Sequence, residues 1–390
     1  MPNRPCVPAP YTVALRRLAL YFLKLGATGF GGPVALAHHM RRDLVETRGW
    51  LSEQEYADGL AIATACPGPL AYQLGVYCGY VRYGVGGALT VAVAFALAPF
   101  LCVSLIAALY QRFTGNWEVQ ALFYGIAPVV VALILKACWQ LGRKTLGLNP
   151  ATWIFALMAG GITLLVRREL VTLFILAGLA GCLVFRSRVA GPSPDVPAPP
   201  PASAGAGLVL AGGASAVPAL KLFTFFFKTG LLVFGSGLVI APFLKAYVVD
   251  QYHWLSDRQF LDALAVGLIT PGPVVITATF VGYLLDGLRG AVAATAGIFA
   301  PAVLFTIVAA PLLRRYRSNR YVQGFVQGIV CAVIGALVAT SLLVARDALR
   351  DTLAVVLAVA SLVAVLRWPR LPEPVLVLAG ALAGVISHWL

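Results

Sequence analysis

Glycine and proline break the apolar runs in the first half of this chain at two places, and these breaks constrain its fold more than any other feature. The first segment, Phe22 to Pro33, holds a lone lysine, Lys24, followed by a cluster of glycines. The second is Cys66-Pro-Gly-Pro69, with apolar residues on both sides. Inside a membrane, broken backbone survives only within protein or beside a water-filled cavity, because bare N–H and C=O groups are costly in hydrocarbon. The segments therefore predict broken or re-entrant helices at a protected place.

The composition shows that a lipid bilayer surrounds these segments. The chain has 390 residues, of which 60% are hydrophobic and 11% charged, whereas a soluble domain carries roughly 25% charged residues. The apolar runs are long and continuous, unlike the ~10-residue alternating segments of a membrane barrel. We therefore predict an all-α polytopic membrane protein. The net charge of +14 is spread over short connections, as expected of Lys and Arg beside a bilayer.

Both segments recur 204 residues further along the chain. Lys24 matches Lys228, and the Pro-Gly-Pro at 67–69 matches the one at 271–273. The chain is thus a two-fold internal repeat, and a Pro/Ala-rich stretch that forms neither helix nor core separates the halves. We predict a first membrane repeat at 11–186, a linker at 187–206 and a second membrane repeat at 207–390.

Apolar runs near the ~20 residues that a bilayer requires give candidate spans in each half. They lie at about 13–38, 57–81, 85–110, 119–141, 150–166 and 170–185, and at about 219–246, 258–285, 289–313, 322–345, 352–366 and 372–390. The short runs at 150–166 and 170–185 predict a tight hairpin that tilts, thins the bilayer or fails to cross fully. The distribution of Lys and Arg favours halves of opposite orientation, an inverted repeat. An inverted repeat needs an odd number of crossings, which six runs do not supply.

A helix is predicted to begin at each of the two Trp-Leu-Ser sequences, at 50–52 and 254–256. Each serine is followed three residues later by Glu or Gln, which makes a capping box, and tryptophan marks the membrane interface. Asp58 and Asp262 lie six residues beyond these serines. Each acid either carries a coupling proton or pairs with a nearby Arg or Lys, and both interpretations remain open.

The four breaks predict an anion site at the interface of the repeats. A proline at the first position of a helix leaves first-turn N–H groups free, and the helix dipole favours an anion there. The alternative is a kinked helix or close helix packing. Lys24 and Lys228 would neutralise charge at the site, or else snorkel to the headgroups. Gln73 and Thr277, at matching positions after the prolines, can donate uncharged hydrogen bonds.

The predicted site residues fall into two groups. The substrate-binding candidates are Lys24, Gly26, Phe30, Gly31, Gly32, Pro67, Gly68, Pro69, Gln73, Lys228, Gly230, Phe234, Gly235, Pro271, Gly272, Pro273 and Thr277. The coupling candidates are Asp58 and Asp262.

Other kinds of site find no support in the sequence. The seven cysteines include no Cys-x-x-Cys and no histidine at metal spacing, so we assign no disulfide, metal or cofactor. No nucleophile elbow, His-Glu-x-x-His or P-loop indicates an enzyme, and no basic stretch interleaved with aromatics indicates nucleic acid. His38 and His39 have no counterparts in the second half and are interpreted as surface residues.

These motifs resemble the two-domain chromate transporter family of bacteria. The likeness rests on Phe-x-Lys-x-Gly-x-x-x-Phe-Gly in each half, on the Trp-Leu-Ser sequences and on the Pro-Gly-Pro segments, and it extends from about Tyr11 to Leu390. The resemblance implies a multi-pass transporter of the bacterial plasma (inner) membrane that exports chromate and confers chromate resistance. It also implies an odd number of crossings with inverted halves.

We therefore expect a secondary active transporter whose breaks enclose a tetrahedral dianion, chromate or a sulfate-like ion. Its partners would be this dianion and the bilayer, with no nucleic acid, and a homodimer is compatible with this interpretation. The first alternative is an importer or exchanger of sulfate or another anion. An alternative from a different class is a membrane enzyme or a scaffold that does not transport. An enzyme would require clustered His, Asp or Glu, and a scaffold would need neither the breaks nor the membrane lysines.

Overall fold

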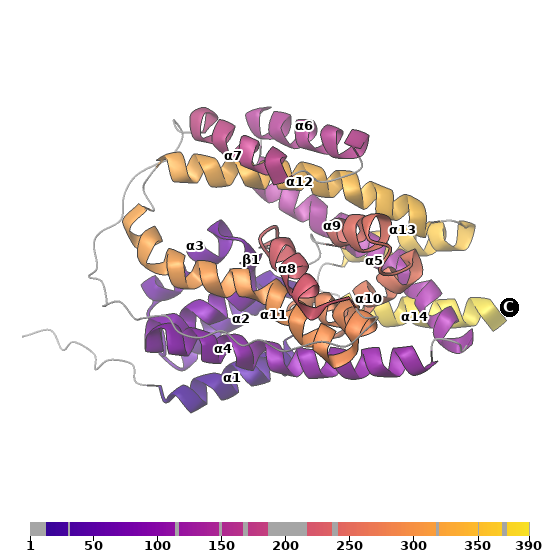
Figure 1. Cartoon of the computed structure of the whole chain (residues 1–390), viewed down its shortest axis with the longest axis horizontal. Coiled ribbons are helices and arrows are strands. Elements are labelled where there is room, and N and C mark those ends of the chain that lie inside the picture. The colour runs from indigo at the N-terminus through magenta and orange to yellow at the C-terminus, as the bar shows by residue number, and fades with distance from the viewer. Residues whose placement is uncertain are drawn as a thin grey trace, which may run out of the picture.

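The structure, a computed structural model, describes residues 13–29, 32–113, 117–147, 150–166, 171–185, 217–235, 241–316, 320–349, 351–368 and 373–389. Nearly all of this part of the chain is helical (Figure 1). The first half contains α1 (Leu15–Thr28), α2 (Gly32–Arg41), η1 (Arg42–Thr47), α3 (Glu53–Ala65), β1 (Gly68–Pro69), α4 (Leu70–Phe113), α5 (Trp117–Leu146), α6 (Pro150–Val166) and α7 (Val171–Val184). The second half contains α8 (Ala219–Gly230), β2 (Phe234–Gly235), α9 (Ala241–Lys245), η3 (Ala246–Gln251), α10 (Asp257–Ile269), η4 (Val274–Ile276), α11 (Thr277–Tyr316), α12 (Arg320–Ala348), α13 (Thr352–Arg367) and α14 (Glu373–Trp389).

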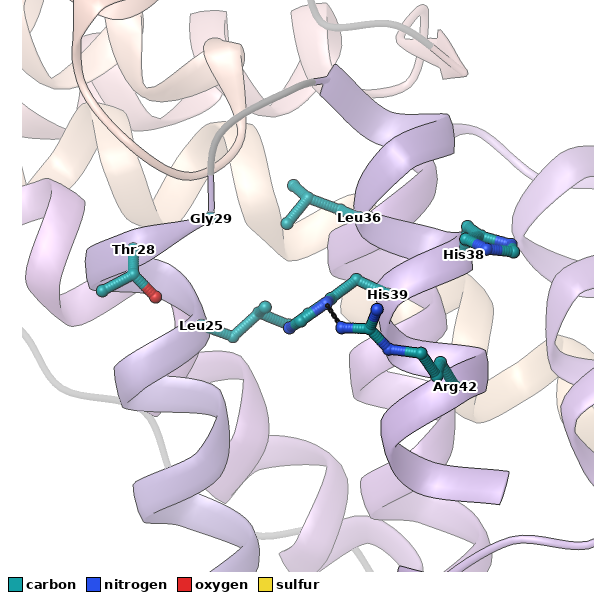
Figure 2. Close-up of a pocket in the computed structure, with 7 residues that line it drawn as sticks. All are labelled: Leu25, Thr28, Gly29, Leu36, His38, His39 and Arg42. Carbon is teal, nitrogen blue, oxygen red and sulfur yellow. Dashed lines mark hydrogen bonds between the residues drawn. The ribbon is translucent and has the colours of Figure 1, made fainter. Parts of the chain in front are cut away.

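The first hairpin of the fold consists of α1 and α2. α1 ends at Thr28, and α2 runs back in the opposite direction (Figure 2). The π-helical turn η1 then returns the chain to Trp50, whose ring lies 5.8 Å from that of Tyr21 in α1. The candidate span at 13–38 is therefore not a single crossing, because the predicted break at the glycine cluster divides it into two helices that turn back on each other.

The second hairpin consists of α3 and the first part of α4, with Pro-Gly-Pro at its tip. The capping box predicted at Ser52 is present and starts α3. Arg82, near the end of the returning helix, donates to Trp50 O at 2.6 Å and to Glu55 Oε2 at 2.6 Å, close to the start of α3. The chain reverses again directly afterwards, at Gly84, which has a φ of 59°. The candidate span at 57–81 is therefore a re-entrant hairpin and not a single crossing.

The second half repeats both hairpins. α8 is followed by α9 and η3, and α10 by η4 and the first part of α11, which is interrupted at Gly287 with a φ of 54°. The Lys245 ammonium lies 3.1 Å from the Asp257 carboxylate. The ion pair 204 residues earlier, between Arg41 and Glu53, has an N···O distance of 2.9 Å. Equivalent ion pairs thus tie the two hairpins of each half together where the chain passes from one to the next.

The hairpins of the two halves have their bases at opposite ends of the protein. Beyond Gly84, α4 continues for 29 residues, which is about 43 Å of helix. The base of the first half lies at the start of this arm, where the Tyr83 hydroxyl donates to Val13 O. The base of the second half lies at its far end, where Gln111 Nε2 donates to Leu284 O at 3.3 Å. The predicted inverted repeat with broken helices is therefore confirmed.

The short helices at the end of each half pack against the other half. α6 and α7 lie on α12, and α13 and α14 lie on α5; Figure 1 shows α6 and α7 along α12. The helices approach closely where glycines face each other, and a Cβ added to Gly335 would lie 1.8 Å from Ala156 O. Such small-residue seams are typical of helix packing in membranes. The halves are thus interlocked by a reciprocal exchange of hairpins.

Three stretches of the described chain are long and apolar enough to cross a membrane. They are Leu70–Phe113, Ala121–Gln140 and Val274–Val308. The first includes both the returning part of α4 and its long arm. Four shorter apolar helices accompany them, among them Pro150–Leu165, which agrees with the short hairpin expected there.

Candidate functional site

The tips of the hairpins from the two halves meet and bind each other through their backbones. Gly68 N–H donates to Val233 O at 2.6 Å, and Gly272 N–H donates to Gly29 O at 3.0 Å. Donor and acceptor are offset by the same 204 residues, so the two bonds are related by the internal symmetry. β1 and β2 extend the first contact as a two-residue parallel pair, in which Gly68 lies opposite Phe234. We call this contact of the hairpin tips the tip junction.

Glycine is required at both Pro-Gly-Pro tips. Gly68 has a φ of 148° and Gly272 a φ of 102°, values that residues with a side chain rarely adopt. A Cβ on Gly68 would lie 2.8 Å from the Cβ of Ala302 in α11. A Cβ on Gly272 would lie 3.1 Å from Cγ of Pro99 in α4. Each tip therefore presses its backbone against the long helix of the opposite half.

The side chain of Gln73 lies fully buried beside the tip junction. Its Oε1 is 2.8 Å from the position of a Cβ on Gly68. Neither its Oε1 nor its Nε2 has a hydrogen-bond partner among the described residues. Leaving buried polar atoms unpaired costs about 1–3 kcal/mol. A buried amide without a partner at a predicted binding site is the feature expected of a ligand donor.

Thr277 is not the counterpart of Gln73, although the sequence placed the two at matching positions. The close glycine pair Gly79–Gly87 recurs as Gly282–Gly290, which shifts the register by one residue after Pro-Gly-Pro. The equivalent of Gln73 is then the buried Ile276. The hydroxyl of Thr277 donates to Val274 O at 2.9 Å and closes the short turn η4. The hydroxyl hydrogen of Thr277 is therefore already bonded within the turn.

The two Pro-Gly-Pro segments also start different structures. In the first half α4 begins at Leu70, directly after Pro69, so its first-turn N–H groups lie next to the tip junction. In the second half Pro273 leads into the 3-10 turn η4, in which Ile276 N–H donates to Pro273 O at 3.0 Å.

Several predicted residues are placed only in part. Phe30 and Gly31 lie outside the described residues, and for Gly32, Phe234 and Gly235 only the backbone element is described, in α2 and β2. Pro67 and Pro271 are half-buried next to the tip glycines.

The two membrane lysines lie on the outer faces of their helices. Lys24 and Lys228 are exposed, about five residues or 7 Å of helix before the tips. The opposite faces pack inward through Gly26 and Gly230, where an added Cβ would lie 2.3 Å from Phe95 O and 2.6 Å from an equivalent carbonyl in α11. The lysines are thus brought near the tip junction along the chain but do not point into the packed interface.

The two coupling candidates have different surroundings. Asp262 is 3% exposed, and its Oδ2 accepts a hydrogen bond of 2.6 Å from the hydroxyl of Tyr110, at the far end of α4. Asp58 is half-buried and accepts a hydrogen bond of 3.1 Å from Gln54 in its own helix. Asp262 therefore joins the two halves, whereas the bond to Gln54 stays within α3.

A cavity of about 310 Å³ lies between α1 and α2 (Figure 2). Its lining includes Gly29 of the tip junction together with His38, His39 and Arg42. Both histidines are exposed, as the sequence analysis interpreted them, although it did not predict this cavity. The signal was available in the sequence, because the first half differs here from its own repeat. In the described part of the chain, no three His, Cys, Asp or Glu side chains gather as a metal site.

Comparison with known proteins identifies the chain. The sequence model of the chromate transporter family matches it twice, over residues 16–182 and 220–385. This chain belongs to the chromate transporter family. It is 40% identical to the chromate transport protein of Cupriavidus metallidurans over 97% of this chain and 94% of that protein. It is 39% identical to the probable chromate transport protein of Synechococcus elongatus, over 96% of this chain and 95% of that one.

A third relative is more distant. The chromate transport protein of Pseudomonas aeruginosa is 32% identical over 82% of this chain and 78% of its own length. No solved structure matches this chain. Membership of the chromate transporter family makes the chain a multi-pass membrane transporter of an anion.

Proposed function

We propose that this chromate transporter carries a tetrahedral dianion through the tip junction, and that its role is the export of chromate across the plasma membrane of a bacterium, giving chromate resistance. The observation that supports this most directly is the reciprocal pair of backbone bonds, Gly68 to Val233 and Gly272 to Gly29. Broken helices that meet between inverted repeats are the usual binding place in secondary transporters. The choice of chromate as the substrate rests on the names of the relatives, which are chromate transport proteins.

The binding chemistry of the site follows from its charge. A dianion leaving water must meet several fixed positive potentials at once, because one contact cannot replace its hydration. The N-terminus of α4 is equivalent to about half a positive charge, and Gln73 adds an unpaired amide beside it. Lys24 and Lys228, one in each half, are exposed on the outer faces of their helices about five residues before the tips, and add positive potential from outside the packed interface. Together these groups offset a charge that neither source could offset alone.

Transport would proceed by rocking of the inverted halves. Each symmetry-related bond of the tip junction closes one path from the outside to the centre, and breaking one while keeping the other opens the site to a single side. This is the alternating access that inverted repeats allow.

The runner-up is an importer or exchanger of sulfate or a related anion. The donors at the tip junction are amides and a helix end, which recognise oxygen atoms and charge and do not distinguish chromium from sulfur at the centre of the ion. Flux measured with both anions therefore separates the two functions.

The experiment is chromate flux into inside-out vesicles and into proteoliposomes of the full chain, with sulfate as competitor. We expect gradient-driven chromate uptake into inside-out vesicles. We also expect the Lys24→Met/Lys228→Met variant to show an apparent affinity at least about tenfold weaker, because the path to the site loses two positive charges. Arg367→Gln, which removes an exposed cation at the end of α13, serves as the control.

Two results would contradict the proposal. Sulfate uptake without chromate flux would favour the importer or exchanger. A correctly inserted double-lysine variant with unchanged affinity would show that the lysines snorkel and that the anion is held by other groups.

A further inference from the structure

The cavity between α1 and α2 has apolar walls and a basic rim. Leu25 of α1 and Leu36 of α2 form the walls, and Gly29 lies at the end nearest the tip junction. Figure 2 shows the side chains of His39 and Arg42 reaching from α2 and η1 toward Leu25. Because Gly29 O accepts the bond from Gly272, the cavity ends at the tip junction itself.

The contacts at the rim give each ring nitrogen of His39 a hydrogen-bonding role. Arg42 Nη2 lies 3.2 Å from His39 Nδ1, and a guanidinium can only donate, so Nδ1 is the acceptor. Nε2 then carries the hydrogen and faces Asp43 Oδ2 at 3.3 Å. A second proton, on Nδ1, would oppose the guanidinium and break this contact. His39 and Arg42 would then both be free to donate to an ion in the cavity.

The rim of the cavity carries one permanent cation, Arg42, and one acid, Asp43. Asp43 approaches Arg42 at 3.9 Å and His39 at 3.3 Å. His38, from α2, lines the cavity as well. From α1, Lys24 is exposed one turn before Thr28, whose hydroxyl donates to its carbonyl at 2.8 Å.

Among the described residues of the second half, the equivalent positions do not carry this polar lining. The equivalents of His39 and Arg42 are Phe243 and Ala246, and the equivalent of Asp43 is Tyr247. The rings of Phe243 and Tyr247 lie 4.6 Å apart, and Phe243 is buried. The ion pairs that tie the hairpins together are nevertheless present in both halves. The polar groups of the first half are therefore not required by the hairpin fold.

We propose that this cavity is a second anion site, an antechamber that takes up one tetrahedral dianion together with one proton on His39. Protonated His39 and Arg42 supply two positive charges to the ion, of which Asp43, in contact with both, offsets one. The antechamber belongs to the first half alone, so the anion and the proton are taken up together at one face of the membrane only. The inference rests on the proposed function, since it supplies the tip junction with its substrate.

The test is equilibrium binding of radiolabelled sulfate to the purified full chain at about pH 6 and about pH 8, the range in which an imidazole gains its proton. Sulfate is the probe because, unlike chromate, it does not itself take up a proton in this range. We compare His39→Gln and Arg42→Gln with Arg16→Gln, which removes an exposed cation of α1 outside the cavity. Chromate flux is measured on the same preparations in proteoliposomes.

We expect the unmodified chain to bind sulfate about tenfold more tightly at the lower pH, the effect of one added charge-assisted hydrogen bond. His39→Gln should lose this difference and keep the weaker affinity at both pH values. Arg42→Gln should bind about tenfold more weakly throughout, and Arg16→Gln should behave as the unmodified chain.

Two outcomes would overturn the antechamber. One is pH-dependent binding that persists in His39→Gln, and the other is an absence of sulfate binding at either pH, in each case with chromate flux intact. A chain that shows no flux of chromate or sulfate would instead contradict the proposed function.

Discussion

At the scale of single residues, Gln73 is the side chain most closely tied to the proposed mechanism. It is fully buried next to Gly68, and both polar atoms of its amide lack a partner within the described chain. A protein gains no stability from such a group, so its presence needs another reason. A transported anion would accept from Nε2 during its passage and leave without breaking a permanent bond.

Replacing Gln73 with Leu should separate binding from folding. The variant removes an unpaired amide, so we expect its stability to be equal or up to about 1 kcal/mol higher. Chromate flux should fall at least about tenfold, because a donor to the anion is lost. Thermal unfolding and proteoliposome flux measure the two effects. Ile276→Leu, at the equivalent position, is the control and should leave flux unchanged; normal affinity in Gln73→Leu would exclude the amide as a ligand.

Asp262 should matter more than Asp58 for coupling. A carboxyl buried in a membrane protein is costly when charged and is by default a functional group. Asp262 shares its hydrogen bond with Tyr110 at the contact between the halves, where movement would change its surroundings. We expect Asp262→Asn to abolish gradient-driven transport while leaving equilibrium anion binding within about twofold of normal, since the amide preserves the bond to Tyr110.

The comparison with Asp58→Asn completes this prediction. Its bond to Gln54 lies within one helix, so we expect a smaller loss of driven transport. If both variants transport normally across the pH range, neither acid carries the coupling proton, and the energy comes from an exchanged anion.

The sequence predicted some of these residues and missed others for physical reasons. Pro-Gly-Pro and Gln73 stand out because breaks and polar groups are expensive in an apolar run. Thr277 was misaligned because the one-residue shift follows Pro-Gly-Pro, where η4 replaces the first turn of an α-helix. In the sequence, His39 and Arg42 could be recognised only as a difference between the two halves. That they line a cavity together with α1 follows from the hairpin, which their sequence positions do not reveal.

At the scale of elements, the re-entrant hairpins explain why counting apolar runs gave too many crossings. An apolar run has the same length and hydropathy whether it crosses the membrane once or turns back inside it. The deciding information is local: the breaks at the tips, and Gly84 and Gly287, whose positive φ reverses the chain at the bases. Hydropathy could not predict the hairpins, but the glycines and prolines of the sequence did predict where their tips lie.

Gly68→Ala should impair transport without removing any charge. The added methyl group would meet Ala302 at 2.8 Å, and the φ of 148° is strained for alanine. We expect a loss of about 1–3 kcal/mol in stability, the usual cost of such backbone strain, and a loss of flux at least tenfold because the tip junction is displaced. Gly86→Ala is the matched control, since nothing lies within 4 Å of its added Cβ. Equal flux in both variants would show that close backbone contact at the tip is unnecessary.

At the scale of the whole molecule, the exchange of hairpins limits how the halves can move. α6 and α7 lie on α12 and α13 and α14 on α5, with glycines in contact along the seams. Separating the halves would expose these seams, whereas rocking about them would not. The moving parts are then the re-entrant hairpins, whose contact at the tips includes the two symmetry-related backbone bonds.

The inverted arrangement can be tested by labelling single cysteines from each side of the membrane. In a background without the seven native cysteines, Thr47→Cys and Gln251→Cys place exposed thiols in η1 and η3, the turns at the bases of the two halves. These bases lie at opposite ends of the long arm of α4, about 43 Å apart. An impermeant thiol reagent should therefore label the two variants from opposite sides. Gln111→Cys should follow Gln251→Cys, because Gln111 lies level with Leu284 in the second half. Labelling of Thr47→Cys and Gln251→Cys from the same side in intact cells would contradict the inverted halves, and with them the rocking mechanism.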